Sequence, residues 1–147
     1  MADRRKKGFT LIELVVVVCI VAILLVLTLP SYQGQLRKMR RSLGAAELLQ
    51  VMMRQEQYFV DHKRYADTLT DLDFPGSPYA IDAQGNAGSA LADDRIYLIE
   101  LSLHQEAYTL RAIPQLGQSA DRLCGTLSLD SMGIKRATGE SATRECW

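Results

Sequence analysis

The feature that most constrains this chain is an apolar stretch near its start that contains a single charge. Basic residues occupy positions 4–7, and from Phe9 to Leu29 the only charged side chain is Glu13. As a helix, these 21 residues would measure about 32 Å, enough to cross the roughly 30 Å apolar core of a bilayer. Because the basic residues flank its start, we expect residues 1–8 to stay cytoplasmic and the remainder to be exported.

Glu13 is the anomaly in this stretch, because a carboxylate inside a membrane helix costs roughly 2–3 kcal/mol and therefore indicates a function. No basic residue lies within helical reach on its membrane side. Cleavage between Gly8 and Phe9 would create an α-ammonium group four residues before Glu13. We expect this amine, on the same subunit or on a neighbour, to neutralise the acid.

The string GFTLIE at positions 8–13, followed by an apolar run, closely resembles the prepilin signature of type IV pilins and type II secretion pseudopilins. The resemblance implies that a prepilin peptidase cuts after Gly8, that Phe9 is then N-methylated, and that Glu13 aids filament assembly. An ordinary signal peptide fits less well, since its apolar core usually has about 7–15 residues before a small-residue cleavage site. A plain membrane anchor would leave Glu13 without a role.

Residues 31–60 continue with an amphipathic helical pattern. Pro30 removes one helical hydrogen bond, so we expect a kink between the membrane half of the helix, residues 9–30, and this second half. Apolar residues recur at alternating spacings of three and four, which predicts a stripe that packs on a sheet. The stripe consists of Leu36, Met39, Leu43, Ala46, Met53 and Val60, widened by Leu49 and Phe59.

Residues 61–147 are predicted to form the periplasmic part. An ordered loop, with one helical turn near Leu69 to Leu72, and an exposed, mobile loop over residues 82–94 precede the strands. Segments 96–103 and 107–113 alternate in polarity across a short link, which predicts a hairpin. Segment 125–129 and a short segment 134–136 continue an antiparallel meander, and residues 137–145 form a polar loop. The fold class is α+β, a long helix packed on this sheet.

Three cysteines differ in their surroundings. Cys19 lies in the apolar stretch and is expected to behave as a small apolar side chain. Cys124 and Cys146 lie in the exported part, where an oxidising compartment favours a disulfide. Their bond would close a loop of about 20 residues, worth roughly 3 kcal/mol. A metal site fits less well, because the chain has no C-x-x-C and no nearby His pair.

The charge of the periplasmic part limits the kinds of molecule that it can bind. From Asp61 onward there are 8 basic and 13 acidic residues, which disfavours nonspecific nucleic-acid binding but leaves a local basic patch open. The basic cluster Arg37, Lys38, Arg40 and Arg41 would contact anionic lipid headgroups or lie on a solvated helix face.

No catalytic motif is present, so we expect neither an enzyme nor a cofactor. His62 and His104 are isolated, and the loop acids lack the spacing of a calcium site, so no metal is expected. The loop acids in question are Asp67, Asp71, Asp73, Asp93 and Asp94.

The order of long helix, connecting loop, antiparallel sheet and C-terminal disulfide loop resembles the type IV pilin plan. The run from Tyr108 through Cys124-Gly125 to Cys146-Trp147 looks like the PilE-type minor pilins of type IVa pili. The resemblance implies a minor pilin of a retractile filament that serves twitching motility, adhesion or DNA uptake. The alternatives are a major pilin, a type II secretion pseudopilin and, from another class, a membrane-anchored ligand-binding protein.

The same resemblance implies the partners and the location of the chain. The partners would be major and minor pilins, the prepilin peptidase, the inner-membrane assembly platform, and lipid before assembly. The chain would cross the inner membrane once, with its leader in the cytoplasm and its folded part in the periplasm, and would then enter the extracellular filament.

Overall fold

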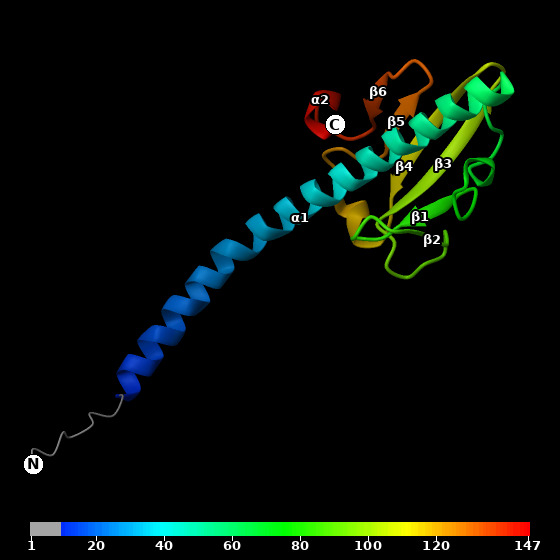
Figure 1. Ribbon diagram of the computed structural model, residues 1–147. Coiled ribbons are helices and arrows are strands. Elements are labelled where there is room, and N and C mark those ends of the chain that lie inside the picture. The colour runs from blue at the N-terminus through cyan, green and yellow to red at the C-terminus, as the bar shows by residue number, and fades with distance from the viewer. Residues whose placement is uncertain (1–9) are drawn as a thin grey trace, which may run out of the picture. The chain divides into compact units, whose positions relative to one another are not determined.

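The computed structural model describes residues 10–147, without the side chains of residues 27–31. The chain divides into a first unit that ends at Leu36 and a second unit, Arg37–Trp147, which we call the head. Helix α1 (Leu11–His62) is the first element (Figure 1). The elements that follow are η1 (Thr70–Leu72), β1 (Tyr79–Ile81), β2 (Ala87–Gly88), β3 (Tyr97–His104), β4 (Ala107–Pro114), η2 (Leu116–Ala120), β5 (Leu127–Asp130), β6 (Lys135–Ala137) and α2 (Thr143–Cys146).

Helix α1 is helical at every position from Leu11 to His62, position 30 included. At its start, the hydroxyl of Thr10 accepts a hydrogen bond from the backbone N–H of Glu13 at 3.4 Å. This is one half of a capping box, in which a Thr satisfies an N–H that the first helical turn leaves free. The absence of a linker after position 30 agrees with the sequence prediction. The kink at Pro30 stays a prediction, because that side chain lies outside the described residues.

The strands of the head form one antiparallel sheet in the order β2-β1-β3-β4-β5-β6. Strands β3 and β4 form the predicted hairpin, paired from Tyr97 with Pro114 to His104 with Ala107. Gln105 takes a positive φ of 53° in the turn between them. Strands β5 and β6 continue the meander. The alternation of side chains along each strand is what made this part of the fold predictable.

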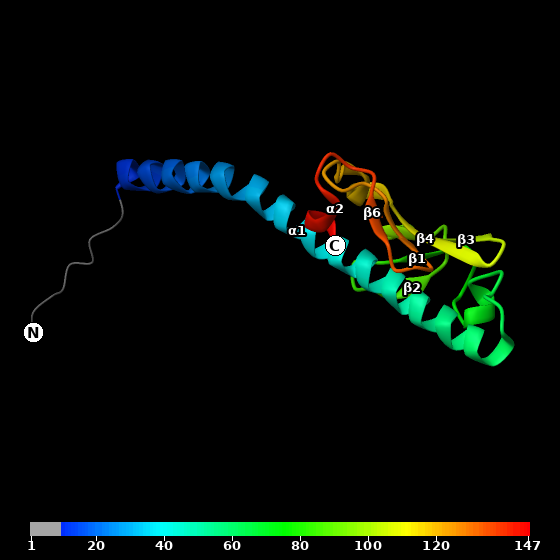
Figure 2. The same cartoon turned by 90° about the horizontal axis from the view of Figure 1, so that it is seen from above.

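The head half of α1 lies along one face of the sheet, as Figures 1 and 2 both show. Leu48 and Val51 of the helix are fully buried there against side chains that point from alternate strand positions. Burying each such side chain stabilises the fold by roughly 1.5–3 kcal/mol. The strand residues of this core are Tyr79, Ile81, Tyr97, Ile99, Tyr108, Leu110, Ala112, Leu127 and Leu129.

The predicted apolar stripe of α1 is wrong. Met39, Met53 and Val60 are 56, 66 and 65% exposed, respectively. Ala46, Leu49 and Phe59 are also exposed, and Leu36 and Leu43 are half-buried. The buried positions come two residues later, and two residues at about 100° each turn a helix to nearly its opposite face. The buried stripe consists of Arg41, Gly44, Leu48, Val51 and Gln55, beside Glu47.

The physical reason is that the buried stripe contains polar residues whose partners lie far along the chain. Arg41 belongs to it, so its predicted place at lipid headgroups or on a solvated face is wrong. Gly44 belongs to it because a Cβ there would lie 3.0 Å from the ring of Tyr97. Arginine and glycine do not contribute to an apolar period. The period of apolar residues therefore follows the outer face of the helix instead.

Four short elements were not predicted. Strands β1 and β2 pair with each other across a turn built on Asp82, whose carboxylate accepts backbone hydrogen bonds from Gln84 and Asn86. The segment predicted as a mobile loop therefore contains part of the sheet. Helices η2 and α2 lie in the segments after β4 and β6, so the predicted C-terminal loop is partly helical. Each element has two to five residues, too few for a period to be read.

Candidate functional site

The predicted processing site, Gly8 and Phe9, lies outside the described residues. Glu13 is described, and it lies exposed in the first turn of α1. A carboxylate at this position interacts favourably with the partial positive charge at a helix N-terminus. A local role at the helix start and a role in assembly are thus compatible for Glu13.

The first unit exposes the large apolar side chains between Leu11 and Val26. Large apolar residues from Leu11 to Val26 are all at least 46% exposed in the isolated subunit. Apolar surface of this extent marks a segment that is buried by another molecule. Within residues 10–147, no helix qualifies as long and apolar enough to span a bilayer.

A buried ion pair joins α1 to the segment after β4. The guanidinium of Arg41 donates two hydrogen bonds to the carboxylate of Asp121, at 2.9 and 2.8 Å, and both side chains are buried. Gln118 lies beside this pair, and its amide donates to the hydroxyl of Tyr97 and to the carbonyl oxygen of Arg37, both at 3.2 Å. The bidentate geometry fixes both the position and the rotation of α1 on the sheet.

A second buried polar contact lies about one and two-thirds turns further along α1. The hydroxyl of Tyr79 in β1 donates a hydrogen bond to the carboxylate of Glu47. Burial raises the pKa of Glu47 above its ordinary value, although the hydrogen bond from Tyr79 acts in the opposite direction. Burial also raises the pKa of Tyr79, and it raises that of Tyr97 to about 12, so both phenols are neutral: Tyr79 donates to Glu47, and Tyr97 accepts from Gln118.

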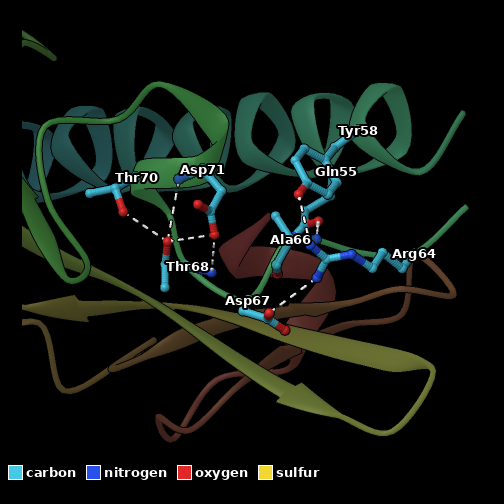
Figure 3. Close-up of polar contacts among 8 residues, drawn as sticks. All are labelled: Gln55, Tyr58, Arg64, Ala66, Asp67, Thr68, Thr70 and Asp71. Atoms are coloured by element: carbon cyan, nitrogen blue, oxygen red, sulfur yellow. Dashed lines mark hydrogen bonds and ion pairs between the residues drawn. The ribbon is translucent and has the colours of Figure 1, made fainter. Parts of the chain in front are cut away.

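The end of α1 is tied to the loop that follows it. The amide of Gln55, fully buried, donates to the carbonyl oxygen of Ala66 at 3.1 Å and accepts from its N–H at 2.9 Å. Figure 3 shows this pair of contacts, with Arg64 reaching Asp67 beside it at 3.2 Å. One side chain thereby satisfies both polar groups of a buried backbone unit. The loop 63–67 is positioned as a result.

Further along the same loop, Thr68 and Asp71 exchange hydrogen bonds that hold η1, as Figure 3 also shows. The predicted helical turn near Leu69 to Leu72 is confirmed by η1. Asp67 and Asp71 are thus engaged in local contacts. No cluster of three or more potential metal ligands exists among the described residues.

The predicted disulfide is present, between Cys124 and Cys146, whose Cα atoms are 5.6 Å apart. The tail also lies directly on the backbone before β5: the N–H of Gly139 donates to Cys124 O at 3.0 Å. A Cβ on Gly139 would lie 2.3 Å from the oxygen of Leu123, so only glycine permits this approach. Trp147 adds a contact to β6 through the carbonyl oxygen of Arg136 at 3.0 Å.

An N-terminal helix with uncovered apolar side chains, whose second half packs on an antiparallel sheet closed by a C-terminal disulfide, defines a type IV pilin subunit. The sequence model of the family described as "Type IV minor pilin ComP, DNA uptake sequence receptor" matches residues 30–128. That is more than half of the chain, and the chain therefore belongs to this family. A model of the prokaryotic N-terminal methylation motif matches residues 3–29. The family and the motif indicate a membrane-anchored or pilus-surface protein of a structural rather than an enzymatic family.

Curated relatives match over shorter stretches. The type II secretion system core protein G of Aeromonas hydrophila is 33% identical over 73 residues, which cover 50% of this chain and 51% of that protein. The type IV major pilin protein PilA of Myxococcus xanthus is 31% identical over 90 residues, 61% of this chain and 40% of that protein. The chain thus spans about half the length, or less, of these relatives.

Among solved structures, a type IV pilin from Shewanella oneidensis aligns with a TM-score of 0.45 and 19% identity. The alignment covers 74% of this chain and 97% of that one.

Proposed function

We propose that this chain is a minor subunit of a retractile type IV pilus that serves twitching motility and adhesion. The match of residues 30–128 to a minor-pilin family carries this proposal. The partners are then other pilins in the filament, the prepilin peptidase and the inner-membrane assembly platform. The relatives that are major pilins or secretion pseudopilins define the alternative roles.

In this proposal, residues 1–8 are the leader, and cleavage after Gly8 leaves Phe9 as an N-methylated first residue. Residues 9–30 hold the subunit in the inner membrane as a single pass, with Pro30 as a bend. Residues 31–60 continue the helix and residues 61–147 lie in the periplasm. The methylation motif at residues 3–29 and the exposed apolar side chains of Leu11 to Val26 support this arrangement.

Assembly moves the helix from lipid into a filament core. Both environments are apolar, so burial of the apolar side chains alone gives little preference for the filament. Glu13 supplies the preference, since pairing with the N-terminal amine of a neighbouring subunit removes an unpaired charge from a low-dielectric site. We expect Glu13→Ala to fold its head normally and to be lost from filaments, whereas normal incorporation would contradict this role.

The test of the proposed function is quantitative mass spectrometry of sheared pili beside the membrane fraction, following the N-terminal peptide. A trace species in pili that begins at methylated Phe9 supports a minor pilin. A dominant species there identifies a major pilin, and a processed protein found only in membranes identifies a pseudopilin. Replacement of Gly8 by a bulky residue serves as the control, because it should leave the precursor uncut.

A second candidate function is DNA binding, since the family description names a DNA uptake sequence receptor. The acidic charge balance of the whole periplasmic part disfavours nonspecific nucleic-acid binding. It does not bear on a local patch of basic residues. Arg122, Lys135 and Arg144 are exposed basic residues around the disulfide tail. The ammonium of Lys135 lies 5.2 Å from the ring centroid of Trp147, which gives a cation beside an aromatic face. Glu140 and Glu145 in the same tail limit this surface to local phosphate contacts.

Fluorescence anisotropy with a labelled DNA duplex at several salt concentrations tests this second function. If Lys135 and Arg144 contact phosphates, the double alanine variant binds more weakly, and its salt slope falls by about one per lost contact. Lys63→Ala, which removes an exposed charge from another part of the head, is the matched control. An equal loss in both variants, or no binding by the native chain, rejects DNA binding at this surface.

A further inference from the structure

The head contains a cleft that none of the roles above uses. Its volume is about 500 Å³, and it lies between the end of α1, the loop that follows, and the turn of the β3–β4 hairpin. Figures 1 and 2 place that end of α1 and the hairpin turn together, away from α2 and the disulfide tail. A volume of this size is in the range of small-ligand sites, about 300–1,000 Å³.

One wall of the cleft is aromatic. Phe59 is 39% exposed, and its ring lies 4.9 Å from the ring of Tyr65 at an angle of 34°. Tyr65 in turn lies edge-on against Tyr108 at 4.7 Å, and its hydroxyl donates to Glu56 at 3.3 Å. These contacts hold the ring of Tyr65 in place. The result is a fixed apolar surface, with Leu103 also in the lining, beside the polar groups of the cleft.

The remaining lining is polar except for Leu103, and it carries no net charge. Lys63 and Arg64 supply two positive charges, and Asp67 and Glu106 supply two negative ones. Arg64 pairs with Asp67, but within residues 10–147 neither Lys63 nor Glu106 forms an ion pair. The Lys63 ammonium donates one hydrogen bond, to Val60 O at 2.9 Å. The cleft therefore offers a free carboxylate as acceptor and an ammonium with donors to spare.

The cleft walls are fixed before any ligand arrives. Lys63 follows the last residue of α1 with a positive φ of 58°, which turns the chain back toward the hairpin. The contact of Gln55 with Ala66 then holds the loop against the helix. Gln105 holds the opposite side in the hairpin turn, also with positive φ. A site held in this way loses little conformational entropy on binding.

We infer that this cleft binds a neutral carbohydrate. The C–H face of a pyranose ring would lie on Phe59 and Tyr65, and its hydroxyl groups, which both donate and accept, would meet Glu106, Gln105 and Lys63. Positive and negative charges balance in the lining, so an anionic ligand gains no net attraction there, and a wholly apolar one would leave the charged groups without solvent or partner. The inference goes beyond a structural role in the filament, and it stands whether the subunit is a minor or a major one.

Saturation-transfer difference NMR on the full chain in dodecylphosphocholine micelles tests the inference, since this detergent contains no sugar. The probes are lactose, maltose and chitobiose, with 6′-sialyllactose as an anionic comparison. We expect saturable binding of at least one neutral disaccharide with a Kd on the order of 1 mM. Sialyllactose should bind no more tightly than lactose.

Variants separate the aromatic wall from nonspecific effects. Phe59→Ala should weaken binding about tenfold, because it removes the stacking surface, and Phe59→Tyr should restore it. Glu106→Gln should weaken binding about threefold, because an amide accepts a weaker hydrogen bond than a carboxylate. Leu91→Ala, at another exposed apolar residue, should leave binding unchanged.

Two results would overturn the inference. One is the absence of saturable binding by every neutral probe up to about 20 mM, twentyfold above the expected Kd. The other is equal binding by the native chain and Phe59→Ala, with circular dichroism showing both folded. The first result includes binding of sialyllactose alone, which would reject a neutral carbohydrate as the ligand.

Discussion

Within the head, helix α1 has two faces whose chemistry is opposite to what their surroundings would suggest. The face against the sheet carries Arg41, Glu47 and Gln55, all buried. The face toward solvent carries Met39, Met53 and Val60, each more than half exposed. The difference teaches that the two faces serve different partners: one is matched to groups within this chain, and the other is available to another molecule.

The buried face obtains its specificity from polar contacts. An apolar stripe alone could slide or rotate on the sheet at little cost, because apolar packing tolerates rearrangement. The Arg41–Asp121 pair, the hydrogen bond from Tyr79 to Glu47, and the contact of Gln55 with Ala66 each permit one position only. Buried polar groups that lose their partners are costly, so these contacts exclude other registers.

The largest expected effect is that of Arg41→Ala, which leaves the buried carboxylate of Asp121 unpaired. We expect the free energy of unfolding to fall by about 3–5 kcal/mol, measured by urea denaturation of the full chain in micelles. Lys38→Ala, an exposed cation one turn earlier, should change it by less than about 0.5 kcal/mol. The double variant Arg41→Met with Asp121→Leu should regain most of the loss. Equal losses for Lys38→Ala and Arg41→Ala would show that the pair does not hold the helix.

Gln55→Ala tests the next contact. The N–H and carbonyl oxygen of Ala66 would lose their buried partner, so we expect a loss of about 2 kcal/mol. Hydrogen exchange at the Ala66 amide should accelerate more than at β4, because the loop opens locally. Gln57→Ala removes the same side chain from an exposed position and is the control. If protection at Ala66 is unchanged in Gln55→Ala, the loop is held by other contacts.

Met53→Lys addresses the outer face. Because Met53 is 66% exposed, the charge should alter the stability of the isolated subunit by less than about 0.5 kcal/mol. If this face is covered in the filament, the fraction of the variant in sheared pili should nevertheless fall, measured by quantitative mass spectrometry. Gln57→Lys adds a charge one turn away and shows how wide the covered region is. Undiminished incorporation of both variants would mean that the face stays in solvent.

Glu47→Gln should have the smallest effect on the free energy of unfolding. The effect should show as a change in how that free energy depends on pH. The folded-state pKa of Glu47 is raised by burial, so the folded chain binds its proton more tightly than the unfolded chain does. The contribution of Glu47 to stability is therefore greatest below its unfolded pKa and is lost as pH rises through the folded pKa. The stability of Glu47→Gln relative to the native chain should thus increase over this range. A difference independent of pH would show that Glu47 is not protonated on folding.

The sequence predicted those parts of the fold that depend on neighbours in the chain. The β3–β4 hairpin follows from local alternation and a short turn, and the disulfide follows from two cysteines in an exported segment. The face of α1 that packs on the sheet could not be predicted. An arginine in a helix is typical of a surface position, and only the fold brings Asp121 beside Arg41. The cap formed by Thr10 could have been predicted, because the pattern Thr-x-x-Glu was present.

The aromatic cleft was missed for a similar reason. The sequence predicts Phe59 in the helix stripe and Tyr65 in the loop after it, and only the turn back at Lys63 brings their rings together. A positive φ at a lysine has no sequence signal comparable to a glycine at a helix end. The hairpin turn on the opposite side was predicted, but nothing in its residues indicated which element it would face.

The 80 residues that separate Arg41 from Asp121 have a consequence for how the head folds. A contact between such distant positions closes a long loop, whose entropic cost must be met before the contact contributes anything. Local structure, such as the β3–β4 hairpin, shortens the effective loop, so the ion pair should form late. Variants at Arg41 should consequently speed unfolding while leaving the folding rate nearly unchanged. The Arg41–Asp121 pair, which sets the position of the helix, would then slow the unfolding of the head without speeding its folding.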